Sequence, residues 1–347
     1  MKNLIFICCI LIILFKTGNV LSDNKIFNVN NIEISKGISK NKEKLADQAF
    51  QKGFKKLINR LLLEEDYKRI SATNLEQIKR LISYYQIINK KEDRKDNDNI
   101  KFNIFFDKER IHNFFYEKNI LYSDIINTDI IIFPLLINDR KYFIYTKNYF
   151  YQNWNNEDSK SLIEYTLPVE NIENIQKIKL NKESIYKINI EDFFKEYESE
   201  NMAFVIIKID KNIAKVFLNT KIAGKKLKKN LLINSSDLTQ QQFNDKIILE
   251  IKNSIRDLIK SQNLIDVRTP SFLNVEIKLN NKNNLVEFNN RIKKIDLIDN
   301  FYVQQLNKDY ALVKIKYLGK IDKIIKKHKD QNIDLNMREG QWQLNII

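Results

Sequence analysis

The sequence predicts an α+β fold of two or three lobes, each with helices packed on one face of a mainly antiparallel sheet. Three observations support this fold class. The 347 residues suffice for two or three domains, and 43% of them are apolar. Segments with helical spacing of apolar residues alternate with short β-rich segments. Only 6 Gly and 3 Pro occur, which excludes collagen-like, linker-like and Pro-rich organisation.

Residues 1–22 have the three-part build of a secretory signal peptide. Lys2 precedes an apolar run at residues 4–15, and Val20-Leu21-Ser22 supplies a small-residue cleavage site. The run is shorter than the roughly 20 residues that a membrane-spanning helix needs. We therefore expect a mature chain that begins near Asp23 and resides in the periplasm. The alternative is an uncleaved N-terminal anchor.

The two cysteines, Cys8 and Cys9, both lie inside this apolar run. The bulky Phe6 and Ile7 precede them, which disfavours lipidation. Cleavage would leave a mature chain without cysteine, so we expect no disulfide, no thiolate nucleophile and no Cys-ligated metal.

An N-terminal α+β domain is predicted at residues 23–155. Its strongest helix signal is residues 45–62, where apolar side chains recur along one face. Thr73 and Glu76 have the spacing of a capping box and predict a short helix. The charged segment at 90–99 predicts a solvated hairpin loop. The other predicted elements are strands at 26–34, 84–88, 100–106, 130–137 and 142–146 and a helix at 108–118.

A polar stretch at residues 152–161 predicts the next boundary, with a middle α+β domain at 156–268. It would contain an apolar segment at 162–167, a helix at 190–198 and a β-hairpin with strands at 203–209 and 213–220. Thr239 and Gln242 predict a capped helix. The predicted buried stripe of that helix is Phe243, Ile247, Ile248, Ile251, Ile255, Leu258 and Ile259.

A C-terminal domain at residues 269–347 repeats the order strand, helix, hairpin, helix, strand. The strands are expected at 272–279, 301–306, 310–317, 333–336 and 342–346, with helices at 285–294 and 320–329. This order is typical of the split βαβ, or ferredoxin-like, arrangement.

The sequence offers no catalytic, cofactor-binding or metal-binding residues. His112 and His328 are far apart and lack metal-ligand spacing, so structural or surface roles are expected. The scarce glycines exclude phosphate-binding loops, and no G-x-S-x-G elbow occurs. The carboxylate pairs Glu64-Glu65 and Glu191-Asp192 are expected at helix ends or in solvent.

The positive charge points to anionic partners. The chain carries +15, and removal of residues 1–22 leaves 57 basic against 44 acidic residues, a net charge of +13. A possible anion-binding patch consists of Lys225, Lys226, Lys228 and Lys229. Export disfavours nucleic acid, so the expected partners are an envelope protein, an anionic lipid or a glycan. The lysine and asparagine excess also fits AT-rich codon usage.

Several segments resemble an exported proteobacterial family of unknown function, the domain of unknown function 2066. They are KLADQAFQKGFKKLINRLL, Tyr84-Tyr85, KFNIFFD, RIHNFFYEKNI, IIIFPLLI and YFYQNW ending in Trp154, within residues 26–167. Asn155 stands where a second Trp is expected. The resemblance implies a secreted or periplasmic α+β protein, and it supplies no catalytic residues.

These observations favour a non-enzymatic binding or assembly module of the cell envelope, which presents sheet edges or a basic face. One alternative is a carboxylate-dependent hydrolase that acts on an envelope polymer. Another is a peripheral protein that binds an anionic membrane surface through its basic face.

Overall fold

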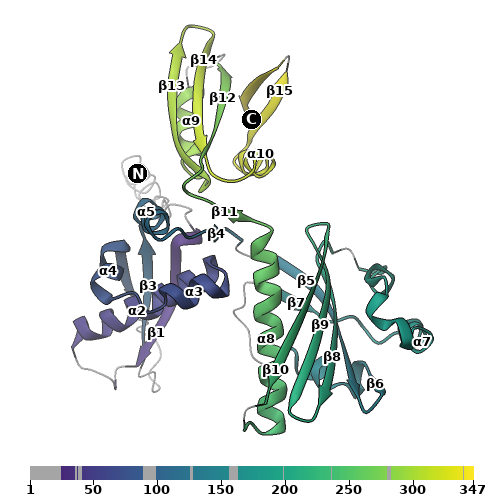
Figure 1. Cartoon of the computed structure of the whole chain (residues 1–347). Helices are drawn as coiled ribbons and strands as arrows, with labels where there is room; N and C mark the ends of the chain where they lie inside the picture. The colour runs from purple at the N-terminus through teal and green to yellow at the C-terminus, as the bar shows by residue number, and fades with distance from the viewer. Residues whose placement is uncertain are drawn as a thin grey trace, which may run out of the picture. The chain divides into compact units, whose positions relative to one another are not determined.

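The computed structural model describes residues 25–35, 37, 41–88, 99–125, 128–155, 163–197, 199–235, 237–279, 283–338 and 340–347. The predicted signal peptide and the predicted loop at 90–99, apart from Asn99, lie outside these ranges. The α+β prediction is confirmed. The chain forms two compact units, Met1–Leu57, Asn74–Asn119 and Asp266–Ile347 in the first, and Ile58–Thr73 and Ile120–Ile265 in the second (Figure 1).

The first unit contains a three-stranded antiparallel sheet in the order β1-β3-β2. Its strands are β1 (Asn28–Ser35), β2 (Ile82–Ile88) and β3 (Asn99–Phe106). Its helices are α4 (Leu75–Leu81), α5 (Lys108–Lys118) and α2 (Lys42–Leu61), whose residues from Ile58 onward belong to the second unit. The ring of Phe54 on α2 lies 6.4 Å from Phe106 and 6.1 Å from Phe114. Gly53 permits close packing, since a Cβ there would lie 2.5 Å from Ile104 Cδ1.

The cap of α4 differs by one residue from the prediction. Asn74, and not Thr73, accepts a hydrogen bond from the backbone N–H of Gln77 at 2.8 Å. The Thr73 hydroxyl instead donates to the carbonyl oxygen of Ile70. Both residue types cap helices well, so the sequence alone did not separate two adjacent candidates.

A second sheet of the first unit has the order β13-β14-β12-β16-β15. The elements are β12 (Ser271–Lys278), α9 (Asn284–Ile292), β13 (Ile298–Leu306), β14 (Tyr310–Tyr317), α10 (Ile321–Asp330), β15 (Ile333–Arg338) and β16 (Gln341–Ile346). β12 and β13 both pair antiparallel with β14 between them, which is the predicted split βαβ arrangement. β16 inserts between β12 and β15 and pairs parallel with β12.

The second unit contains a six-stranded mixed sheet in the order β10-β9-β8-β5-β6, with β7 also paired to β5. The strands are β5 (Thr128–Asn138), β6 (Lys141–Phe143), β7 (Ile163–Thr166), β8 (Met202–Asp210), β9 (Ile213–Ile222) and β10 (Lys225–Asn234). The helices are α3 (Glu64–Ile70), α6 (Tyr149–Asn153), α7 (Ile172–Leu180) and α8 (Gln240–Ser261). β4 (Tyr122–Ser123) and β11 (Leu264–Ile265) form a separate antiparallel pair.

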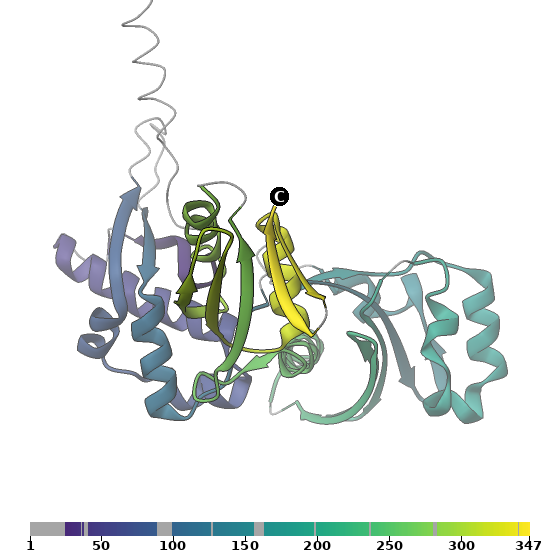
Figure 2. The same cartoon turned by 90° about the horizontal axis from the view of Figure 1, so that it is seen from above.

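Both faces of the six-stranded sheet are covered, which corrects the prediction of helices on one face only. Ala203, Val205 and Ile207 join a core with α6 and α8, whereas Phe204 and Ile206 join a core with α7. Figure 2 shows α7 and α8 on opposite sides of this sheet. The cause is the apolar character of β5 and β8 on both faces, as in buried parallel strands.

The predicted helix at 190–198 is wrong, because the described part of this segment forms the 3₁₀ turn Ile190–Phe193. Helix α7 and strand β10 were not predicted from the sequence. The capped helix α8 is confirmed, with a complete capping box between Thr239 and Gln242.

The observed units divide the chain differently from the three predicted domains. Residues 120–155 group with 163–265, because β5 pairs in parallel with β8 over Ile131–Ile137 and Met202–Lys208. Within the described ranges, no helix has both the length and the apolar character required to cross a membrane.

Candidate functional site

The structure distributes the predicted lysine patch over two faces of β10. Side chains alternate along a strand, so Lys225 and Lys229 share the face of Leu227 and Leu231, which pack towards the α8 core. Lys226 and Lys228 point to the other face. The four ammonium groups therefore do not form one surface.

Ion pairs further divide this patch. Glu191 lies 3.4 Å from Lys226 Nζ and 2.9 Å from Lys221 Nζ. The hydrogen bond from Lys221, together with both nearby positive charges, lowers the pKa of Glu191. Glu191 thus neutralises part of the positive charge of the lysine patch that was predicted to bind an anion.

The other residues that the sequence singled out have structural partners. Glu64 begins α3 and pairs with Lys68 and Arg256. His328 is fully buried, and its Nδ1 lies 2.8 Å from the carbonyl oxygen of Ile324. Burial lowers the pKa of His328.

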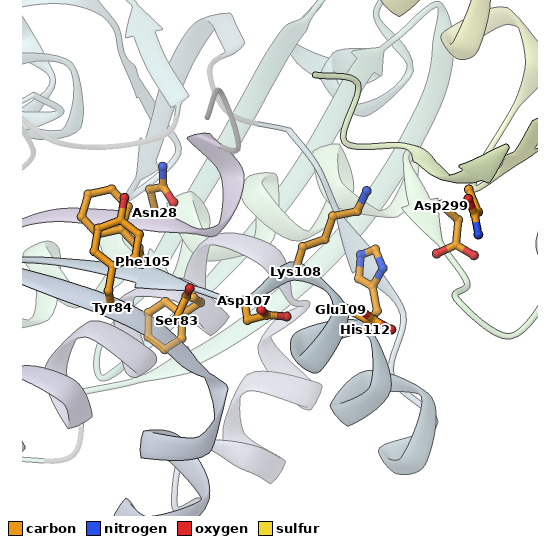
Figure 3. A pocket seen from close by; sticks show the side chains of 11 residues that line it. Asn28, Ser83, Tyr84, Phe105, Asp107, Lys108, Glu109, His112 and Asp299 are labelled. Carbon is orange, nitrogen blue, oxygen red and sulfur yellow. The ribbon is translucent and has the colours of Figure 1, made fainter. Parts of the chain in front are cut away.

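A pocket of about 590 Å³ in the first unit is the best candidate for a functional site. It lies at the end of the three-stranded sheet where β3 leads into α5, and its lining combines rings with hydroxyl, amide and charged groups (Figure 3). The lining residues are Asn28, Ser83, Tyr84, Phe105, Phe106, Asp107, Lys108, Glu109, His112, Asp299 and Asn300. Such a volume is within the usual range for small-ligand sites.

The aromatic part of the pocket is built by strand register. Phe105 on β3 is paired with Asn28 on one side and with Tyr84 on the other. The rings of Tyr84 and Phe105 stack at 4.2 Å with an interplanar angle of 11°. Tyr84 remains 40% exposed, so it presents ring surface to the pocket.

The first turn of α5 forms the polar wall. Asp107 caps the helix by accepting a hydrogen bond from the backbone N–H of Arg110 at 3.0 Å. Lys108 and His112 are four residues apart and therefore lie on one side of the helix. Lys108 Nζ donates to the carbonyl oxygen of Ile298 at 2.7 Å.

Burial dominates the electrostatics of this wall. It lowers the pKa of Lys108, while Asp296 and Asp299 act in the opposite direction. Burial, and secondarily the charge of Lys108, lowers the pKa of His112 to about 4. His112 is therefore neutral at pH 7 and contributes hydrogen-bonding capacity without charge.

β13 supplies the third side of the pocket through Asp299 and Asn300. The carboxylate of Asp299 pairs with Lys316 Nζ at 2.7 Å. The amide of Asn300 donates to the hydroxyl of Tyr302 and accepts from the N–H of Phe301. These contacts hold both side chains in place beside α5.

This pocket was not predicted from the sequence. The i,i+4 spacing of Lys108 and His112 after a capping aspartate was the available signal. The residues that β13 contributes are about 190 positions away from α5 along the chain. The side of the pocket that β13 forms could therefore not be predicted from the sequence. Among the described residues, no group of three or more His, Cys, Asp or Glu side chains could hold a metal ion.

Comparisons with known proteins add little to this geometry. No protein-family model matches the chain, and neither does any curated protein. A solved structure that aligns with it is the lipoprotein GNA1162 from Neisseria meningitidis, with 13% identity over 37% of this chain and 95% of that chain. The TM-score of this alignment is 0.23, and we draw no conclusion from it.

Proposed function

We propose that this chain is an exported binding module of the cell envelope and that the pocket on the three-stranded sheet is its ligand site. The observation that carries the proposal is the preformed pocket in which the Tyr84–Phe105 stack meets the first turn of α5. Rigid rings beside a few fixed polar groups are typical of binding sites. The export part rests on the signal-like residues 1–22.

Most polar side chains of the pocket already have hydrogen-bond or ion-pair partners within the protein. Lys108 is tied to a backbone carbonyl, Asp107 caps a helix and Asp299 is paired with Lys316. A nucleophile needs a neighbouring base within hydrogen-bond reach. Because Lys108, Asp107 and Asp299 are already paired, the pocket is better suited to binding a ligand than to covalent catalysis.

Site-specific photo-crosslinking tests the proposal. A photoreactive amino acid replaces Ser83, which lines the pocket, in the full chain expressed in its native cells. We expect reproducible adducts with one envelope component. The matched control carries the same group at Tyr116, which is 58% exposed on α5 and outside the pocket lining. Equal adducts at both positions, or none at Ser83, would contradict a binding site here.

A second candidate function is a carboxylate-dependent hydrolase, and one observation favours it. Asp107, Glu109 and Asp299 line the same pocket, as two-carboxylate catalysis requires. Among the described residues, no ion pair involves Glu109, whereas Asp107 and Asp299 lie near Arg110 and Lys316. Incubation of the chain with purified envelope polymers would show released fragments if it is a hydrolase, and Glu109→Gln would abolish them.

A further inference from the structure

We propose that the pocket binds an uncharged sugar unit of an envelope glycan. This inference rests on the proposed function and names the ligand class of the same site. A sugar ring carries C–H groups on its faces and hydroxyl groups around its rim. Its ligand site therefore needs an accessible aromatic surface beside short hydrogen-bonding side chains, with no requirement for net charge.

The Tyr84–Phe105 stack supplies the aromatic surface. The rings come from adjacent, register-paired strands, and stacking at 4.2 Å restrains the rotation of Tyr84. Because Tyr84 is 40% exposed, its ring can accept the C–H face of a sugar. A ring that is already held in position loses little conformational entropy when the ligand binds.

Hydrogen-bonding groups surround that aromatic surface. Ser83 precedes Tyr84 on the same strand and offers a hydroxyl, and Glu109 offers two acceptor oxygens from the first turn of α5. One carboxylate oxygen of Asp107 accepts a hydrogen bond from the backbone N–H of Arg110, and the other lies 3.9 Å from Arg110 Nε. Figure 3 shows Ser83 and Asp107 between the ring stack and Lys108.

Carboxylates around the pocket, with Asp296 near Lys108 among them, are only partly compensated by basic side chains, which argues against an anionic ligand. The lining holds three carboxylates, of Asp107, Glu109 and Asp299, and one ammonium, of Lys108. Arg110 lies beside Asp107, and Lys316 pairs with Asp299. A phosphate group would meet the carboxylates, and a cation would compete with the existing basic partners. Hydroxyl groups can use the remaining donors and acceptors at lower desolvation cost.

Titration calorimetry with the full mature chain tests this inference. The probes are oligomers of N-acetylglucosamine of increasing length, which carry no charge. We expect at least one to bind, with affinity that changes less than about twofold when salt rises tenfold, because no charge pairing drives the contact. Tyr84→Ala should weaken binding at least about tenfold, which corresponds to about 1.4 kcal/mol.

Two variants locate the contact. Ser83→Ala should weaken binding by about threefold through loss of one hydrogen bond, whereas the control Tyr116→Ala should bind as the wild type does. Equal affinity of Tyr84→Ala and wild type would overturn the proposal.

The failures of the two proposals are distinguishable. If no glycan binds but the probe at Ser83 captures an envelope protein or a lipid, the sugar assignment is wrong and the binding function stands. If neither experiment gives a signal, both are wrong. Anionic vesicles that compete with a bound glycan would also overturn the assignment to an uncharged ligand.

Discussion

Lys260 shows how a single buried charge can organise a segment of this fold. It is 3% exposed, and its Nζ donates to the carbonyl oxygens of Asn59 at 2.6 Å and Leu62 at 2.5 Å. These carbonyls lie at the C-terminal end of α2, where helical partners are lacking. Burial, and the neighbouring Arg256, lower the pKa of Lys260 to about 7. This contact joins residues about 200 positions apart, so no local pattern could reveal it.

Lys260→Met should destabilise the second unit. The methionine retains the length of the side chain but leaves the buried carbonyl oxygen of Leu62 and the partly buried one of Asn59 without their donor. The free energy of unfolding should therefore fall by about 2 kcal/mol. Urea unfolding followed by Trp154 fluorescence in a Trp342→Phe background measures this unit. The control Lys246→Met removes a half-buried lysine from the same helix, whose Nζ donates to one carbonyl oxygen, that of Asn234 at 2.9 Å. Similar losses in both variants would refute the capping role.

His112 predicts acid sensitivity of the first unit. Its pKa is lowered from 6.5 to about 4, mainly by burial. Below pH 6.5 the His112 imidazole of the unfolded chain takes up a proton, whereas in the folded chain it is protonated only below about pH 4. Stability should therefore fall as pH decreases through this window, by at most roughly 3 kcal/mol. Urea unfolding at several pH values checks the slope, which His112→Gln should reduce.

At the scale of elements, the sequence predicted helices with complete end signals and long apolar stripes. α8 has a capping box, and its predicted stripe is buried apart from the partly buried Leu258. β10 was missed because it is an edge strand with four lysines among its first five residues, so its alternation was interpreted as a charge patch. Ala223 and Gly224, both with positive φ, form the hairpin turn that was the available signal.

The capping box of α8 makes a prediction at the same scale. The Thr239 hydroxyl accepts from the N–H of Gln242 at 3.3 Å, and the side chain of Gln242 accepts from the N–H of Thr239 at 3.0 Å. Thr239→Ala should lower the free energy of unfolding of the second unit by about 1 kcal/mol, and Thr239→Ser should largely preserve it. The same Trp154 fluorescence assay measures both. A loss as large in the serine variant would point to a cause other than capping.

At the scale of the whole molecule, the α+β class and the C-terminal split βαβ plan were predictable, because each depends on local periodicity and element order. The grouping of elements was not. Residues 120–155 belong with β8 through parallel pairing, and the first unit combines Met1–Leu57 and Asn74–Asn119 with Asp266–Ile347. The pocket could not be predicted for the same reason, since β2, α5 and β13 are far apart in the sequence and all contribute to it.

Hydrogen exchange of the full chain, with and without solubilised envelope extract, tests the central claim most directly. The account predicts slower exchange of amides in peptides that cover β2 and the first turn of α5, with β10 unchanged. Protection confined to β10, where the lysines predicted from sequence lie, or protection nowhere in the first unit, would contradict a ligand site in the pocket.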